Sequence, residues 1–271
     1  KLSRYLLLNV GVRTRPGLDH MLQAIEEGTF SFEEFKEVLI AGLMHYKQRY
    51  PNILYIEAMN EYDLLSSTRG LKVPYYEYYK VFYEAVNYVN EKLQPEIPLL
   101  LGGPVSWRLY GNNLRTLHWP NGNNLVEEFL DAYAKDPNPS KRLDFIAYHE
   151  YLNRRGFEPS LIDKQKEAIE GELLRRGLDP NIPIFVTEVG VLPSDYGTQD
   201  YHSDLLLQAA GVATLMYRYA EQGIVSFHWV DHHPENDRKD ILVPGHPGKF
   251  TPYGNMMRMQ TMLKEERVYA S

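Results

Sequence analysis

Short apolar runs alternate with longer amphipathic segments along the chain. The first run, residues 5–10, is followed by a segment with apolar residues at helical spacing, and this segment opens with the capping-box sequence Ser31-Phe-Glu-Glu34. The alternation then repeats to the end of the sequence. It predicts strands at residues 5–10, 53–59, 98–103, 143–148, 184–187 and 224–229, and helices at residues 31–46, 75–93, 124–135, 160–176, 200–222 and 253–265.

Strands that are apolar on both faces and separated by helices indicate a parallel sheet covered by helices. The sequence Gly102-Gly103-Pro104 lacks the other residues of a phosphate-binding glycine loop, which disfavours a nucleotide-binding doubly wound sheet. We therefore predict an α/β fold, the (β/α)8 TIM barrel, whose active residues lie where the strands end. The 271 residues are expected to form a single domain.

The composition excludes several classes of protein. With 29 basic and 36 acidic residues the net charge is -7, which argues against a nucleic-acid partner. No apolar run approaches the ~18 residues needed to cross a membrane. The sequence has no cysteine, so disulfides, thiolate metal sites and a cysteine nucleophile are excluded, whereas secreted, periplasmic and cytoplasmic locations all remain open.

Polar and aromatic residues stand at the predicted carboxyl ends of the strands, which meet at one end of a barrel. Two of them are glutamates, Glu61 and Glu188, which we expect to face one cavity. Two carboxyl groups about 5–5.5 Å apart are what retaining glycoside hydrolysis requires. The full set of candidate residues is Asn60, Glu61, Trp107, His149, Tyr151, Glu188, His228, Trp229 and Asp231.

Two further sets of residues have structural interpretations. Glu57 lies about 13 Å deeper along its strand than Glu61, too far to act with it, and we expect a buried, paired carboxylate. The 21 tyrosines are more than a core needs, but most are expected to pack or to cover a helix. The clearest cases are Tyr75, Tyr76, Tyr78 and Tyr79.

The order of these strand-end motifs resembles clan A of the glycoside hydrolases. The motifs are Asn60-Glu61, His149-Glu-Tyr151, Thr187-Glu188 and Trp229. The resemblance implies that Glu61 is the acid/base and Glu188 the nucleophile. It also implies that Asn60 contacts a sugar hydroxyl, that His149 and Tyr151 surround the nucleophile, and that Trp229 forms the floor of the sugar site.

Within the clan the chain looks most like family 39, which includes β-xylosidases, α-L-iduronidases and exopolysaccharide hydrolases. The resemblance covers essentially the whole chain. The similar pieces are Arg49-Tyr50, Glu57, Gly102-Gly103-Pro104 and Asp144-Phe-Ile-Ala-Tyr-His149. The chain departs from the family at Met59, where Trp is usual, and at Tyr62, where Pro is usual.

The resemblance also numbers the strands. If Glu61 ends the fourth strand of the family barrel, residues 5–10 form the third, and the first two βα units are expected to be lacking from this chain. A missing N-terminal segment or a second chain is then expected to complete the barrel.

These inferences predict a retaining glycoside hydrolase that acts on a poly- or oligosaccharide without metal or cofactor. One alternative is a metal-dependent barrel hydrolase, because His228-Trp-Val-Asp231-His232-His233 is rich in potential ligands, although its spacing is not a known zinc motif. Another is an inactive carbohydrate-binding protein. A serine hydrolase is excluded, because no Gly-x-Ser-x-Gly sequence occurs.

Trp119 and the loop at residues 105–123 are further candidates for substrate contacts.

Overall fold

The computed structural model describes most of the chain. The described residues are 5–10, 20, 23–25, 27–64, 73–107, 109, 125–153, 161–192, 201–228, 241–243 and 245–262.

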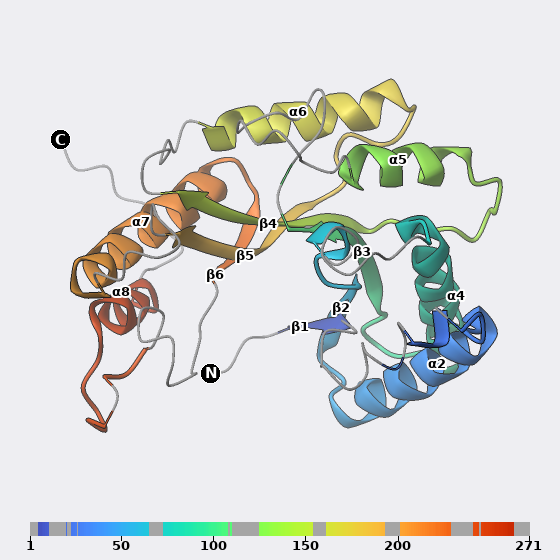
Figure 1. Cartoon of the computed structure of the whole chain (residues 1–271), viewed down its shortest axis with the longest axis horizontal. Helices are drawn as coiled ribbons and strands as arrows, with labels where there is room; N and C mark the ends of the chain where they lie inside the picture. Colours follow the sequence, from blue (N-terminus) through green and yellow to red (C-terminus); the bar gives the residue numbers. More distant parts are fainter. Residues whose placement is uncertain are drawn as a thin grey trace. The chain divides into compact units, whose positions relative to one another are not determined.

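The strands of the described residues form one sheet whose spatial order follows the chain, β1-β2-β3-β4-β5-β6 (Figure 1). β1 pairs with β2, β2 with β3 and β3 with β4, in each case in parallel. A parallel sheet in chain order with helical crossovers is the arrangement of a TIM-type barrel, so the predicted α/β fold class is confirmed. The strands are β1 Leu6–Val10, β2 Ile53–Ala58, β3 Leu100–Ser106, β4 Phe145–Asn153, β5 Ile184–Leu192 and β6 Val225–His228.

The predicted helices are found within a few residues of their expected bounds. Ser31 caps the first of them, since its side chain accepts a hydrogen bond from the Glu34 amide. Gly177 and Gly223 follow two others with φ of 69° and 70°, the left-handed backbone that ends many helices. The helices are α2 Phe32–Arg49, α4 Tyr75–Leu93, α5 Leu125–Lys135, α6 Leu161–Arg175, α7 Tyr201–Glu221 and α8 Pro252–Gln260. None of the helices within the described ranges is long and apolar enough to cross a membrane.

The chain divides into two compact units. The first comprises Lys1–His149 and Lys164–Thr187, and the second comprises Glu150–Asp163 and Glu188–Ser271. In the first unit α2 packs on α4, which also contacts β2, β3 and α5. In the second unit α7 packs on α8 and β6. The expectation that the 271 residues form a single catalytic domain stays a prediction.

Aromatic rings fill the inner face of the first unit. The Phe145 and Phe185 rings stack with centroids 4.6 Å apart, and the Tyr55 ring meets that of Phe185 edge-on at 5.0 Å. Gly102 leaves room for this packing, because a Cβ added there would lie 2.2 Å from the Phe145 ring. The glycine pair after the third apolar run therefore serves close packing in the sheet.

The tyrosines of α4 pack as expected. Tyr75, Tyr76, Tyr78 and Tyr79 are all buried. The Tyr75 hydroxyl donates a 2.6 Å hydrogen bond to the Ala58 carbonyl at the end of β2. A Cβ at Gly103 would lie 2.6 Å from the same hydroxyl, so the second glycine admits this contact.

Several strands are longer than predicted. β3 runs to Ser106, β4 to Asn153 and β5 to Leu192. The charged residue Glu188 suggested an early end to β5, but the β-branched residues Val189 and Val191 continue the strand beyond it. Glu188 and His149 consequently lie within strands and not at their ends, which corrects the expected positions.

Candidate active site

The backbone at the end of β2 is unusual. Met59, Glu61 and Val105 have φ of 66°, 48° and 51°, values that non-glycine residues rarely adopt. The Glu61 amide donates a 2.9 Å hydrogen bond to the Val105 carbonyl. This hydrogen bond connects the segment after β2 with the end of β3. Left-handed backbone at a non-glycine residue costs about 1–3 kcal/mol and tends to occur at functional sites.

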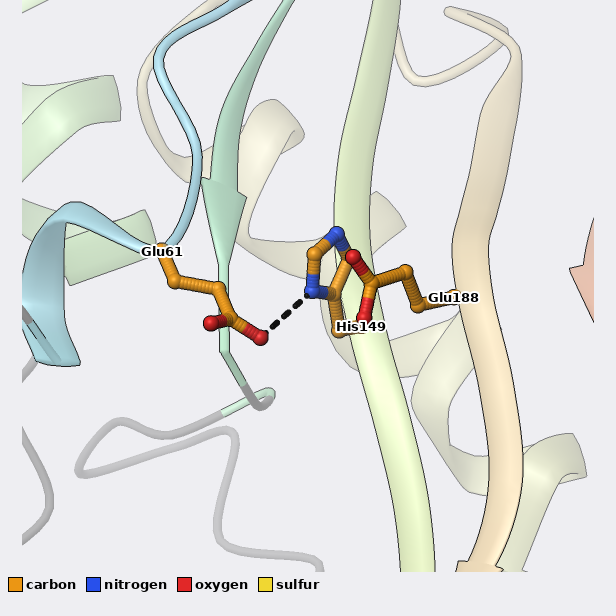
Figure 2. Close-up of side chains that lie close together, drawn as sticks. All are labelled: Glu61, His149 and Glu188. Atoms are coloured by element: carbon orange, nitrogen blue, oxygen red, sulfur yellow. Dashed lines mark hydrogen bonds and ion pairs between the residues drawn. The ribbon is translucent and has the colours of Figure 1, made fainter. Parts of the chain in front are cut away.

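Glu61 contacts a histidine of β4. Its Oε1 lies 2.9 Å from Nδ1 of His149 (Figure 2). Both residues are buried, with exposed fractions of 3% for Glu61 and 0% for His149. A carboxylate would accept a proton donated by Nδ1, and a carboxylic acid would donate to an unprotonated Nδ1, so the pair can hold Glu61 in either protonation state. This is the environment that a group acting alternately as acid and base requires.

A second polar cluster connects β1 with β2. The side-chain nitrogen of Asn9 donates to Glu57 Oε2 at 2.9 Å and to Asn60 Oδ1 at 3.0 Å. Glu57 has an exposed fraction of 1%, which confirms the prediction of a buried, paired carboxylate. Asn60 is therefore adjacent to Glu61 in sequence and is held by the neighbouring strand.

Asp63 is a buried polar residue that the sequence interpretation missed. It accepts hydrogen bonds from the Ser106 hydroxyl at 2.9 Å and from the Trp107 amide at 2.9 Å. Burial raises the pKa of the Asp63 carboxyl, although these hydrogen bonds act in the opposite direction. The sequence placed Asp63 two residues after Glu61, but nothing in the pattern indicated that it fastens the start of the loop bearing Trp107.

The raised pKa of Asp63 predicts a dependence of stability on pH. A carboxyl whose folded-state pKa lies above its ordinary value of 3.8 binds a proton more readily when folded, so its contribution to stability falls as pH rises through that window. The unfolding free energy of the wild type should therefore decrease relative to that of Asp63→Asn as the pH rises above about 4. Urea denaturation across this range measures the difference.

Asp136 provides the control. Despite its partial burial, hydrogen bonds from the Asn138 amide and from the Tyr76 and Tyr83 hydroxyls lower the pKa of Asp136 below its ordinary value of 3.8. Asp136 titrates below that value, so the difference in unfolding free energy between the wild type and Asp136→Asn should stay constant over the same pH range. A constant difference for Asp63→Asn as well would contradict the prediction.

In the second unit, Glu188 is paired with a tyrosine. The hydroxyl of Tyr151 donates a 2.5 Å hydrogen bond to Glu188 Oε2, and both side chains are buried. Gly190 makes this arrangement possible, because a Cβ at that position would lie 2.8 Å from two atoms of the Tyr151 ring. A tyrosine that donates to a carboxylate stabilises its ionised form.

We expect Gly190→Ala to displace the Tyr151 ring and to lengthen its hydrogen bond to Glu188. Loss of one hydrogen bond to a charged group costs about 1.5–3 kcal/mol, so the unfolding temperature of the variant should fall. The matched control is Gly171→Ala in α6, where an added Cβ meets nothing within 4 Å. Thermal unfolding separates the two variants, and equal unfolding temperatures for them would refute a positioning role of Gly190.

Of the remaining candidates, His228 and Trp107 lie within the described residues and the others lie outside them. His228 Nδ1 lies 3.1 Å from the Met216 sulfur of α7, and its ring meets that of Tyr253 in α8 edge-on. Burial lowers the pKa of His228, and its role in substrate binding stays a prediction. Trp107 directly follows β3 and is partly buried. Trp229, Asp231, His232, His233 and Trp119 lie outside the described residues.

Ligands for a metal are few in the described part of the chain. Within the first unit, Glu61 and His149 would supply one carboxylate oxygen and one imidazole nitrogen. The alternative of a metal-dependent hydrolase with ligands in His228-Trp-Val-Asp231-His232-His233 stays a prediction, because residues 229–240 lie outside the described residues.

Comparison with known proteins gives a likeness in structure alone. No protein-family model and no curated protein sequence matches the chain. Among solved structures, a β-porphyranase of glycoside hydrolase family 86 from Bacteroides plebeius has a TM-score of 0.59 and 13% identity over 85% of this chain and 44% of its own. A family 5 xyloglucanase from Paenibacillus pabuli has a TM-score of 0.56 and 14% identity over 95% of this chain and 75% of its own.

A glucosidase from Croceicoccus marinus is also similar, with a TM-score of 0.51 and 13% identity over 82% of this chain and 43% of its own. The chain thus spans less than half the length of the porphyranase and of the glucosidase. At such low identity these matches establish the fold, and the chemistry must be argued from the residues of this chain.

Proposed function

We propose that the protein is a retaining glycoside hydrolase of clan A, with Glu61 as the acid/base and Glu188 as the nucleophile. The observation that most supports this is the buried contact between Glu61 and His149 at the end of β2. The strand order of the sheet also agrees, because the carboxyl ends of parallel strands share one edge, as in the barrel glycosidases. Among the families of the clan, the motifs around Glu57, Gly102 and His149 favour family 39.

The proposed reaction has two displacements. In the first, a carboxylate oxygen of Glu188 bonds to the anomeric carbon while the glycosidic bond breaks and Glu61 gives its proton to the leaving oxygen. In the second, Glu61 takes a proton from water, the resulting hydroxide bonds to the anomeric carbon, and the bond to Glu188 breaks. Glu61 ends the cycle protonated and Glu188 ends it ionised.

The neighbouring residues have roles that follow from their contacts. His149 holds the Glu61 carboxyl in place through both protonation states. Tyr151 donates to Glu188 and so keeps the nucleophile ionised and fixed in orientation. Asn60 and Trp107 are proposed to contact the sugar. Trp229 belongs to the same proposal by resemblance, and His228 and Asp231 by their places at the end of the predicted strand. A poly- or oligosaccharide is the proposed substrate.

The stereochemistry of the product tests the retaining mechanism. We expect proton NMR of an early reaction mixture with an aryl glycoside to show a first-formed sugar with the anomeric configuration of the substrate. Inversion would contradict a nucleophilic Glu188 and would imply a carboxyl separation of about 6.5–9.5 Å. Release of the aryl group without any sugar product would contradict the proposed function altogether.

A chelator separates this proposal from metal-dependent hydrolysis. We expect full activity after dialysis against EDTA, because neither displacement needs a Lewis acid. Loss of activity that is restored by zinc would instead favour the metal-dependent hydrolase. Binding of a polysaccharide without release of reducing ends would favour the inactive carbohydrate-binding protein.

A further inference from the structure

Asn9 and Glu57 face each other across adjacent strands. They are register partners in the parallel pairing of β1 with β2. The Asn9 side-chain nitrogen donates to Glu57 Oε2 and also to Asn60 Oδ1, so one amide group contacts a carboxyl on one side and a second amide on the other. Glu57 and Asn60 are both buried, which raises the cost of any wrongly paired polar atom in this cluster.

The direction of these hydrogen bonds follows from the chemistry of the groups. The NH2 group of Asn9 faces Glu57 and donates to its Oε2, which is the arrangement that an ionised carboxylate, able only to accept, requires. That group has two hydrogens, and the second points to Asn60, whose facing atom must then be the oxygen. The oxygen and nitrogen of an amide diverge from one trigonal carbon, so the NH2 group of Asn60 points in a different direction from the oxygen that faces Asn9.

We propose that Asn9, oriented by Glu57, is a positioning residue that makes Asn60 a hydrogen-bond donor toward the substrate. This inference rests on the proposed function and adds a specificity to it. The sugar must offer an acceptor oxygen at the position that Asn60 contacts. A sugar with an ammonium group there presents only hydrogens and is disfavoured, so the site selects hydroxylated over amino sugars at that position.

Neutron diffraction from deuterium-exchanged crystals tests the orientation without reference to activity, because it distinguishes an amide nitrogen from an amide oxygen. We expect the deuterated amide group of Asn9 to point at Glu57 Oε2 and at Asn60 Oδ1. An Asn9 oxygen facing either residue, or an Asn60 nitrogen facing Asn9, would overturn the proposal. This result is decisive even if the protein hydrolyses no glycoside, in which case only the proposed function fails.

Kinetics test the consequence for the substrate. The probes are an aryl glycoside of the sugar that the protein hydrolyses best and its analogues with one hydroxyl removed or replaced by an amino group. Asn60→Ala and Asn9→Ala should each lower kcat/KM for the unmodified aryl glycoside by about tenfold, because one hydrogen bond contributes about 1.4 kcal/mol. The double variant should be no worse than either single one, since both remove the same contact.

The analogues separate positioning from a general loss of structure. For the one deoxy analogue that lacks the contacted hydroxyl, both variants should match the wild type, and the amino analogue at the same position should be the poorest substrate of the wild type. An Asn9→Ala loss that is equal on every substrate, or losses that multiply in the double variant, would overturn the proposal. Asn255→Ala, at an exposed position of α8, is the control and should leave all rates unchanged.

Discussion

Glu188→Gln is expected to lower kcat by at least about 10³-fold, because an amide oxygen is a poor nucleophile and the covalent intermediate cannot form. The variant should fold normally. Gln has nearly the same size, and its amide oxygen can still accept the hydrogen bond from Tyr151. Turnover of an aryl glycoside and circular dichroism spectra of the two proteins measure these effects.

The control for this variant is Glu167→Gln, an exposed position of α6 that should have wild-type activity. If Glu188→Gln retains turnover of the same order as the wild type, Glu188 is not the nucleophile. A variant that has lost its helical circular dichroism would report on folding, and in that case Glu188→Asp replaces it. Asp keeps the charge but shortens the side chain, and a loss of at least about tenfold is expected from the misplaced oxygen.

The second large effect is expected for Glu61→Gln and depends on the leaving group. For substrates with poor leaving groups, kcat/KM should fall by about 10²–10⁴-fold, the usual contribution of general acid catalysis. For dinitrophenyl glycosides, whose leaving group needs no proton, the formation of the intermediate should be nearly unaffected. The comparison across leaving groups serves as an internal control for folding.

The pH profile of the same variant gives an independent check. The alkaline limb of kcat/KM in the wild type should disappear in Glu61→Gln when the leaving group is good, because no acid is then titrated. Equal losses for good and poor leaving groups, with the alkaline limb unchanged, would assign Glu61 a role other than the acid.

The fold was predictable from the sequence because its signals are local. Apolar runs, the Ser31 capping box and the helix-ending glycines Gly177 and Gly223 each act over a few residues, and all are found where expected. Strand ends were less predictable. Polar side chains within β4 and β5 suggested that these strands end early. In the folded sheet the extended backbone continues to Asn153 in β4 and to Leu192 in β5.

The site was predictable only in part. The motifs indicated Glu61 and His149, but their contact joins residues 88 apart in the sequence and needs the folded sheet. The roles of Asn9, Asp63 and Gly190 depend on where neighbouring strands place their partners, and none of these three belongs to a motif. Gly102 and Gly103 show the same difficulty, because nothing local indicates that they leave room for the Phe145 ring and the Tyr75 hydroxyl.

Trapping of the covalent intermediate tests the central claim most directly. The protein is incubated with an activated 2-deoxy-2-fluoro glycoside, which slows the second displacement, and is then digested for mass spectrometry. The account predicts a single sugar adduct on the peptide that contains Glu188, and its absence from Glu188→Gln. An active protein that forms no adduct, or an adduct on a different residue, would contradict it.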